Sequence, residues 1–492
     1  MPDNITFMTI PVDWRDPGAF IEIDHTRAVR GLPQQRHSIL ILGQRLSTGT
    51  VAEGVLTKVT RKEDGVNYFG RGSMLAQQIA AALKVNPYTE YYALALDDNA
   101  AGVAASGSLA FTGTPTESGT LCLYIGGRRL TVGITSGQTS TQVATAVAAA
   151  ITADADGAVT ATSNVGTVTV TSRHKGVEGN DIDLRVNYYQ GEFTPAGLAL
   201  VITAMASGAG NPDVADAITA MSTLSPYTIL MGWTDATNMG LMETELQTRW
   251  GGMSMRAGHV FGHKSGSYSA LSSYGGARNS AHSTISGLYQ SPALPWVISA
   301  QFGAACEFSG AIDPAVPFRT LALPDVMAPA EASRFTDTER NNLLHDGIST
   351  IVFDQAGSAS ISQVITTYQT NTFGMDDVSL LKLNTKWTVD YMRFAFRSDV
   401  LTNFPRHKLA GDDVLERIQP GQAIATPKLI RNVNIGTAMK LEKVGLLEDL
   451  DQFIKDLIVV RSDADTNRVN AILPPNIVNQ FDVFAAAVQY IL

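Results

Sequence analysis

Four polar residues in the middle of the chain have the side chains that a hydrolase needs. Asp235, His259, His282 and Ser283 would supply a carboxylate, an imidazole and a nucleophilic hydroxyl, in the order Asp–His–Ser. A serine nucleophile of an α/β hydrolase stands in a G-x-S-x-G turn, and residues 196–310 contain no such turn. A hydrolase therefore stays an alternative function for this chain, but one without a marked nucleophile.

Two of the histidines have a spacing that could also suggest a metal site. His259 and His263 are four residues apart, which on a helix would place both imidazoles on one face. Their segment, AGHVFGH, is typical of a strand, where residues four apart are too far from each other to share one zinc ion. Val260 also stands where the helical zinc-protease motif has its glutamate. The sequence predicts no metal site here.

A glycine-rich stretch, GVNYFGRGS (65–73), resembles a phosphate-binding loop. The Walker pattern requires a lysine after the second glycine and then a serine or threonine, which bind phosphate oxygens and Mg²⁺. Arg71 and Gly72 take those places here. We interpret the stretch as a turn before a helix capped by Ser73, and the sequence predicts no cofactor.

The charges of the chain argue against a nucleic-acid surface. The 492 residues carry a net charge of −10, and the only short basic cluster, PRHKL (405–409), is typical of a solvated or partner-facing edge.

Cys122 and Cys306 are the only cysteines, which excludes a disulfide framework. We find neither a secretory signal nor an apolar run long enough to cross a membrane. We expect a soluble chain that is made in a reducing cytoplasm with both termini retained.

The elements that must position these residues change character along the chain. Strand and helix signals alternate at both ends of a segment rich in Thr, Gly, Ser and Val, whose composition indicates an inserted β-rich module. We expect an α/β core with a mainly parallel sheet and helices on both faces, the insertion, and an α+β C-terminal domain. The predicted parts are an N-terminal arm (1–30), the first part of the core (31–100), the insertion (101–195), the main core (196–355), a C-terminal domain (356–470) and a C-terminal arm (471–492).

Both terminal segments have strand patterns without a local partner. AFIEID (19–24) alternates like a half-buried strand, and FDVFAAAVQYIL (481–492) is apolar on both faces. The closing segment could be an internal strand of the chain's own sheet, or it could pair with another copy of the chain. The second interpretation assigns inter-subunit contacts to Phe20, Ile21, Ile23, Phe481, Val483, Phe484, Val488, Tyr490 and Leu492.

Several segments of the chain together carry a family resemblance. They are PVDWRDPGAFIEID (11–24), YFGRGSMLAQQIAAA (68–82), ALDD (95–98), RFTDTERNNLLHDGI (334–348), TTYQTN (366–371), NFPRHKL (403–409), GQAIATPKLIR (421–431) and LPPNIVNQFDVFAAAVQYIL (473–492). These segments resemble the tail sheath proteins of Mu-like contractile-tailed phages. The resemblance covers the N-terminal arm, the α/β core and the C-terminal portion, and it is least specific in the insertion.

The resemblance implies a structural protein of the virion and not an enzyme. Members of this family stack as hexameric rings around a tail tube and contract to drive the tube through the host envelope. The resemblance further implies a core of subtilisin-like topology without hydrolase activity, strand exchange through both arms, and no cofactor, nucleic-acid or membrane partner. The implied partners are other copies of the chain, the tail tube, the baseplate and the tail terminator. A tube or baseplate subunit is a further alternative, which the length of the chain disfavours.

Overall fold

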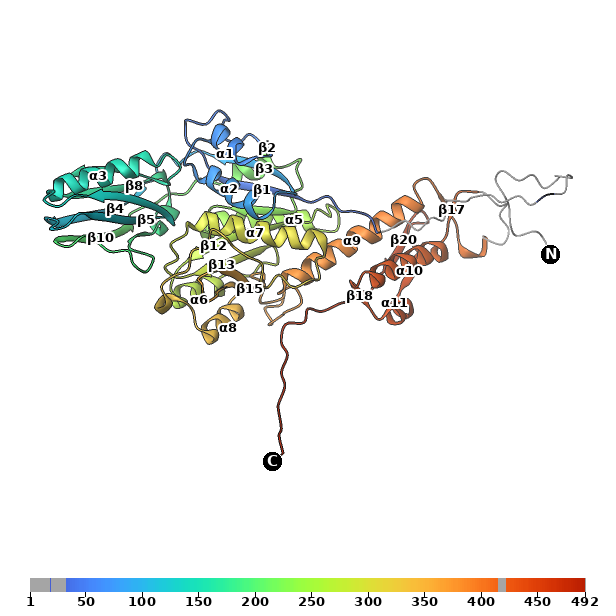
Figure 1. Cartoon of the computed structure of the whole chain (residues 1–492). Coiled ribbons are helices and arrows are strands. Elements are labelled where there is room, and N and C mark those ends of the chain that lie inside the picture. The colour runs from blue at the N-terminus through green and yellow to red at the C-terminus, as the bar shows by residue number, and fades with distance from the viewer. Residues whose placement is uncertain (1–17, 19–31, 415–421, 492) are drawn as a thin grey trace. The chain divides into compact units, whose positions relative to one another are not determined.

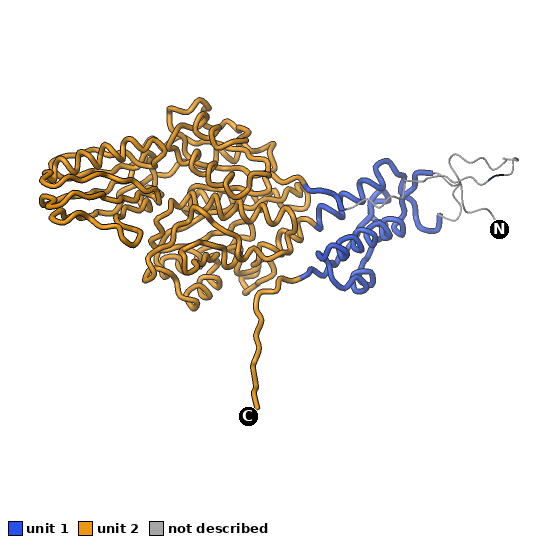
Figure 2. The backbone as a smooth tube through the Cα atoms, viewed as in Figure 1, with its two compact units in different colours: residues 1–35, 392–478 blue, residues 36–391, 479–492 orange. Residues whose placement is uncertain are grey.

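The computed structural model describes residue 18, residues 32–414 and residues 422–491. The chain divides into two compact units, which Figure 2 colours separately. We call residues 36–391 with 479–492 the core unit, and residues 1–35 with 392–478 the C-terminal unit.

The core unit is built on an eight-stranded sheet in the order β15-β14-β13-β12-β11-β1-β3-β2 (Figure 1). The neighbours from β14 to β3 run parallel, and the two edge strands, β2 and β15, are antiparallel. This confirms the predicted mixed α/β fold with a mainly parallel sheet. The strands are β1 (Ser38–Gln44), β2 (Thr57–Val59), β3 (Glu90–Leu96), β11 (Thr228–Met231), β12 (His259–Ser265), β13 (Ser283–Leu288), β14 (Ile348–Phe353) and β15 (Ala359–Gln363).

Helices cover both faces of this sheet because its central strands are apolar on both sides. Ile39 and Ile41 of β1 join the apolar cluster that includes α2 and α7, whereas Leu40 and Leu42 join the cluster that includes α5 and α6. The helices are α1 (Lys62–Phe69), α2 (Met74–Val85), α4 (Ala215–Ala220), α5 (Ala236–Trp250), α6 (Tyr268–Gly276), α7 (Pro295–Ile312) and α8 (Asp337–His345). The capping box predicted at Thr336 and Glu339 is present at the start of α8.

A β-rich module, which we call the insert, enters the core unit after β3. It contains a four-stranded sheet, β10-β4-β8-β7, and a three-stranded sheet, β6-β5-β9, with α3 packed on them. Its two connections to the core lie side by side, since Val103 and Ala209 exchange backbone hydrogen bonds of 2.8 and 3.0 Å. The elements are β4 (Ala104–Gly113), β5 (Gly119–Ile125), β6 (Arg128–Ile134), α3 (Ser140–Ala153), β7 (Val159–Asn164), β8 (Thr167–Lys175), the 3-10 helix η1 (Val177–Asp181), β9 (Leu184–Val186) and β10 (Leu198–Ala206).

The structure places the end of the insert later than the predicted boundary at residue 195. β10 pairs antiparallel with β4, so the segment that we assigned to the start of the main core completes the insert's larger sheet. The segment LCLYIGGRRLTVGI (121–134) predicts a hairpin that turns at Gly126 and Gly127. The structure confirms it, and both glycines have positive φ angles as a tight two-residue turn requires. The segment 140–153 predicts a helix capped by Ser140, whereas the N-cap of α3 is Thr139, one residue earlier.

The C-terminal unit contains short strand pairs and helices. α9 (Leu383–Asn403) begins in the core unit, and its residues from Met392 onward belong to the C-terminal unit, where Phe396 stacks on Phe453 at 5.8 Å. The remaining elements are β16 (Lys408–Leu409), η3 (Asp412–Val414), β17 (Ile424–Ala425), α10 (Pro427–Lys443), β18 (Leu447–Glu448), α11 (Leu450–Asp456), β19 (Ile458–Arg461), β20 (Val469–Ile472) and β21 (Asn476–Ile477).

A single helix over 437–457 is the prediction from its apolar residues, Leu441, Val444, Leu450, Phe453, Ile454 and Leu457, and this prediction is wrong. The structure has two helices there, α10 and α11, with Gly445 between them at a φ of 76°. Because a left-handed residue cannot continue a right-handed helix, the chain turns at this glycine.

Candidate functional site

The residues that could have formed a hydrolase triad bond to other partners. The Ser283 hydroxyl donates to Glu243 Oε1 at 2.6 Å and shares a second hydrogen bond with Thr367 Oγ1 at 2.8 Å. Asp235 is the N-cap of α5, where its carboxylate accepts from the backbone N–H of Asn238. Serine, acid and histidine therefore occupy separate structural roles in the core, and their arrangement supports no nucleophilic mechanism.

The two strand histidines are buried structural residues. His259 Nε2 bonds to Thr284 Oγ1 at 2.8 Å, and His263 Nδ1 bonds to Ser286 Oγ at 2.9 Å. Burial lowers the pKa of His259 far below its ordinary value and lowers the pKa of His263 to about 3. Both imidazoles are thus neutral at physiological pH. Within the residues that the structure describes, no three His, Cys, Asp or Glu side chains gather as metal ligands.

The glycine-rich loop that resembles a phosphate loop is occupied by the protein's own side chains. Ser73 caps α2 as predicted, accepting from the N–H of Ala76 at 3.1 Å. The N–H of Met74, the first residue of α2, donates to His174 Nε2 of the insert at 3.0 Å. Arg71 pairs with Asp156, also of the insert, at 2.6 Å. The loop fastens the insert to the core, and its helix N-terminus has internal partners.

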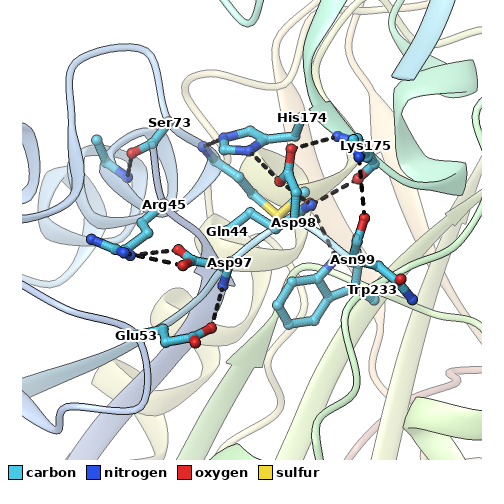
Figure 3. Close-up of polar contacts among 12 residues, drawn as sticks. Gln44, Arg45, Glu53, Ser73, Asp97, Asp98, Asn99, His174, Lys175 and Trp233 are labelled. Atoms are coloured by element: carbon cyan, nitrogen blue, oxygen red, sulfur yellow. Dashed lines mark hydrogen bonds and ion pairs between the residues drawn. The ribbon is translucent and has the colours of Figure 1, made fainter. Parts of the chain in front are cut away.

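A polar cluster continues this attachment along the carboxyl ends of the core strands (Figure 3). Asp98, two residues after β3, is its centre. Its carboxylate accepts from Gln44 Nε2 at 2.7 Å, from His174 Nδ1 at 3.0 Å and from the backbone N–H of Lys175 at 3.0 Å. His174 thus contacts Asp98 through Nδ1 and accepts from the Met74 N–H through Nε2, which joins β8 of the insert to α2 and to the end of β3 in the core.

The contact between Asp98 and His174 is not predicted by the sequence. ALDD (95–98) contributes only to the family resemblance, and His174 lies 76 residues further along the chain than Asp98. Two acids directly after a buried strand were the available signal, because polar groups at carboxyl strand ends of parallel sheets meet at one edge.

The C-terminal segment is an extended chain with neither helix nor strand (Figure 1). Residues 479–491 form no strand, and the side chains that we assigned to inter-subunit contacts are exposed: Phe481 by 65%, Val483 by 79%, Phe484 by 78%, Val488 by 89% and Tyr490 by 79%. Over residues 479–491 the segment is therefore not an internal strand of the chain's own sheet.

Asp482, near the start of this segment, anchors it to the core unit. The Asp482 carboxylate pairs with Lys382 and accepts from Gln363 Nε2 at 3.5 Å, and its carbonyl accepts from Arg319 at 3.4 Å. The other predicted arm residues, Phe20, Ile21, Ile23 and Leu492, lie outside the described residues.

Two protein-family models match the chain in sequence. The model of the phage tail sheath protein central domain matches residues 207–367, and that of the phage tail sheath C-terminal domain matches residues 376–491. The chain is also 38% identical, over 489 residues, to the Mu-like prophage FluMu tail sheath protein of Haemophilus influenzae, covering 99% of this chain and 100% of the relative. The chain belongs to the phage tail sheath family. It is a structural component of a contractile phage tail and hence of the virion.

A solved sheath-protein structure has this fold at low sequence identity. The sheath tail protein of Desulfitobacterium hafniense is similar with a TM-score of 0.50 and 13% identity, over 94% of this chain and 97% of that one. The sheath tail protein of Listeria innocua has a TM-score of 0.49 and 10% identity, over 91% and 93% of the two chains. Among the described residues of this sheath protein, none of the helices has the length and apolarity to cross a membrane.

Proposed function

We propose that this sheath subunit polymerises as stacked hexameric rings around the tail tube and contracts to drive the tube through the host envelope. In this proposal the subunits are joined by strand exchange through their terminal arms. The subunit has no enzymatic role, its core has a subtilisin-like topology, and the domain layout follows the predicted arm, core, insertion, C-terminal domain and arm. Assembly takes place in the host cytoplasm, with the tail tube, baseplate and tail terminator as further partners.

The observation that carries the proposal is the exposed, apolar C-terminal segment. From Val483 to Ile491 it contains no charged residue, and its large side chains are 78–100% exposed. Burying each such side chain contributes roughly 1.5–3 kcal/mol, so a neighbour that covered the five largest would gain on the order of 10 kcal/mol before ordering costs. The apolar side chains of this segment lack cover in the free subunit, and a second copy of the chain would supply that cover by pairing with the segment as a strand.

The edges of the core sheet are poor acceptors for such a strand. β2 is three residues long and carries Lys58, whose ammonium pairs with Glu90 at 2.6 Å. β15 is already covered by residues 320–323, since the N–H of Ile361 donates to Leu321 O and Thr320 donates to Ile361 O. Short, charged or covered edges do not accept a further strand.

The β19–β20 pair of the C-terminal unit is a better acceptor. Within the described residues it has two strands, and a two-stranded sheet is marginally stable in water without added cover. Ile458 and Val460 lie on one face of β19, and Ile472 stands opposite Ile458. These three side chains are 49%, 49% and 60% exposed. We propose that arm strands of neighbouring subunits extend this pair and cover its apolar face.

The test is deletion of residues 483–492, which keeps the Asp482 anchor. The truncated chain should fold with an unchanged circular dichroism spectrum and melting temperature but form no rings or tubes in negative-stain microscopy. Polymerisation that survives the deletion would refute the arm proposal. Loss of the folded subunit would instead show that the segment belongs to its own core.

A matched pair of substitutions tests the acceptor separately. Val460→Lys places a charge on the β19–β20 face and should abolish polymerisation as the deletion does. Val201→Lys places the same charge on an exposed edge-strand position of the insert, where Val201 is 63% exposed, and should leave polymerisation intact. The reverse pattern would move the acceptor to the insert.

A further inference from the structure

A carboxylate of the insert is buried against the core beyond the end of β11. Glu178 lies in η1 and only 6% of it is exposed. Its Oε1 accepts a hydrogen bond from the backbone N–H of Thr234 at 3.1 Å. Its Oε2 is buried and has no hydrogen-bond partner within the described part of the chain. The insert thus meets the core through an acid with one unsatisfied oxygen.

The ionisable groups around Glu178 come from four elements. Asp181 lies on η1 itself, Asp235 caps α5, Tyr274 lies on α6 and Lys264 lies on β12. The nearby amide of Asn211 donates to Asp235 at 2.8 Å, and the Tyr274 hydroxyl donates to the carbonyl of Thr234 at 2.8 Å. An ionised Glu178 would add a third carboxylate beside a single lysine.

The environment favours the neutral form of these acids. Burial raises the pKa of Glu178 to about 7. The Thr234 N–H, Lys264 and the Asn211 amide act in the opposite direction, and their combined effect is smaller than that of burial. Burial also raises the pKa of Asp181, with Lys264 acting against it. Burial is likewise the main cause that raises the pKa of the Tyr274 hydroxyl, so this phenol stays neutral.

We propose that the η1–Thr234 contact is a protonation-dependent joint, which is closed when Glu178 is neutral and which opens when Glu178 ionises. Opening lets water reach the carboxylate and separates it from Asp235 of the core. The other attachments of the insert, at Asp98 and at the paired connections of Val103 and Ala209, keep the insert tethered while this contact opens. Opening of this contact weakens the attachment of the insert to the core and leaves the core folded.

The direction of the pH dependence follows from linkage. A glutamate that becomes exposed in the open state returns to its ordinary pKa of 4.5, so closing the joint binds a proton between 4.5 and about 7. The joint is most stable below the open-state pKa, loses stability as the pH rises through this interval, and changes no further above it. Over the interval the opening constant rises on the order of a hundredfold.

Hydrogen–deuterium exchange of the full chain tests the joint. Amides of 174–182 and 230–238 are followed at pH 5, 6, 7 and 8, with rates corrected for intrinsic exchange. Their protection should fall by about fortyfold between pH 5 and 7 and by about a further twofold by pH 8. Glu178→Gln keeps an acceptor for Thr234 but cannot ionise, and its protection should not vary with pH. Glu117→Gln, at an exposed acid of the insert, should retain the wild-type profile.

Two results would overturn the proposal. Flat protection in the wild-type chain would do so by itself, even if Glu178→Gln failed to fold. A pH profile in Glu178→Gln equal to that of the wild type would assign the dependence to another group.

Discussion

A buried ion pair on α9 allows a quantitative prediction about the stability of the core unit. Lys386 and Asp390 are one helical turn apart, their charged atoms are 2.8 Å apart, and their side chains are 0% and 1% exposed. The ammonium also donates to the carbonyl of Gly258, and the Asp390 carboxylate accepts from the indole N–H of Trp250. At an effective dielectric constant of 20, the attraction between two charges at this distance is about 6 kcal/mol.

Lys386→Met should destabilise the core unit by about 4 kcal/mol at pH 7. The variant leaves Asp390 without its counter-charge, and the least costly response is to bind a proton. Protonating an ordinary aspartate costs about 4 kcal/mol at pH 7 and about 1.5 kcal/mol at pH 5, which limits the loss at each pH. The double variant Lys386→Met/Asp390→Asn removes both charges and should lie within about 1–2 kcal/mol of the wild type.

Urea denaturation of the unassembled subunit, followed by tryptophan fluorescence, measures these differences. Trp387 is buried beside the pair and Trp250 bonds to it, so the signal reports on this region. A loss below 1 kcal/mol at pH 7, or an equal loss at pH 5 and pH 7, would refute the electrostatic reasoning.

Two further predictions concern the attachment of the insert. Gly126→Ala should destabilise the attachment by about 1–3 kcal/mol, because the added Cβ would lie 2.4 Å from Leu294 Cδ2 and the residue has a positive φ. Thermal unfolding measures the loss. Gly133→Ala, which has open space around the added Cβ, is the near-neutral control. His174→Ala should expose the insert's connections to limited proteolysis, since Asp98 loses a donor and Met74 N–H an acceptor, at a cost of about 1–3 kcal/mol. Thr169→Ala, at an exposed position of the same strand, should leave the digestion pattern unchanged, and equal digestion of both variants would contradict this role for His174.

The parts of the fold that were predictable from sequence are those whose signals are local. β11, α5, β12, α6 and β13 follow from short apolar runs and from capping residues such as Asp235 and Ser267, which act within a few residues. The division of 437–457 depends on one left-handed glycine, and the apolar stripe through it concealed the break. β10 was assigned to the core because its partner, β4, precedes it by more than 80 residues.

The contacts between the insert and the core were not predictable either, because their partners are far apart in sequence. Asp98 and His174, and likewise Glu178 and Thr234, are brought together by the topology, and no spacing along the chain records their proximity. The exposed apolar arm, in contrast, was visible in its residues. The hypothesis that it contacts other copies rests on family resemblance, because a pattern apolar on both faces fits an internal strand equally well.

The paired connections at Val103 and Ala209 make the insert a separable cassette. The central-domain family model begins its match at residue 207, directly after β10 ends at Ala206, so the part of the chain that the model matches starts where the insert stops. A module whose two ends leave the scaffold together can be exchanged for another whose termini are adjacent, without lengthening any strand of the host sheet. A foreign domain grafted between these two residues would be carried once per subunit, with both of its ends joined to adjacent positions of the core.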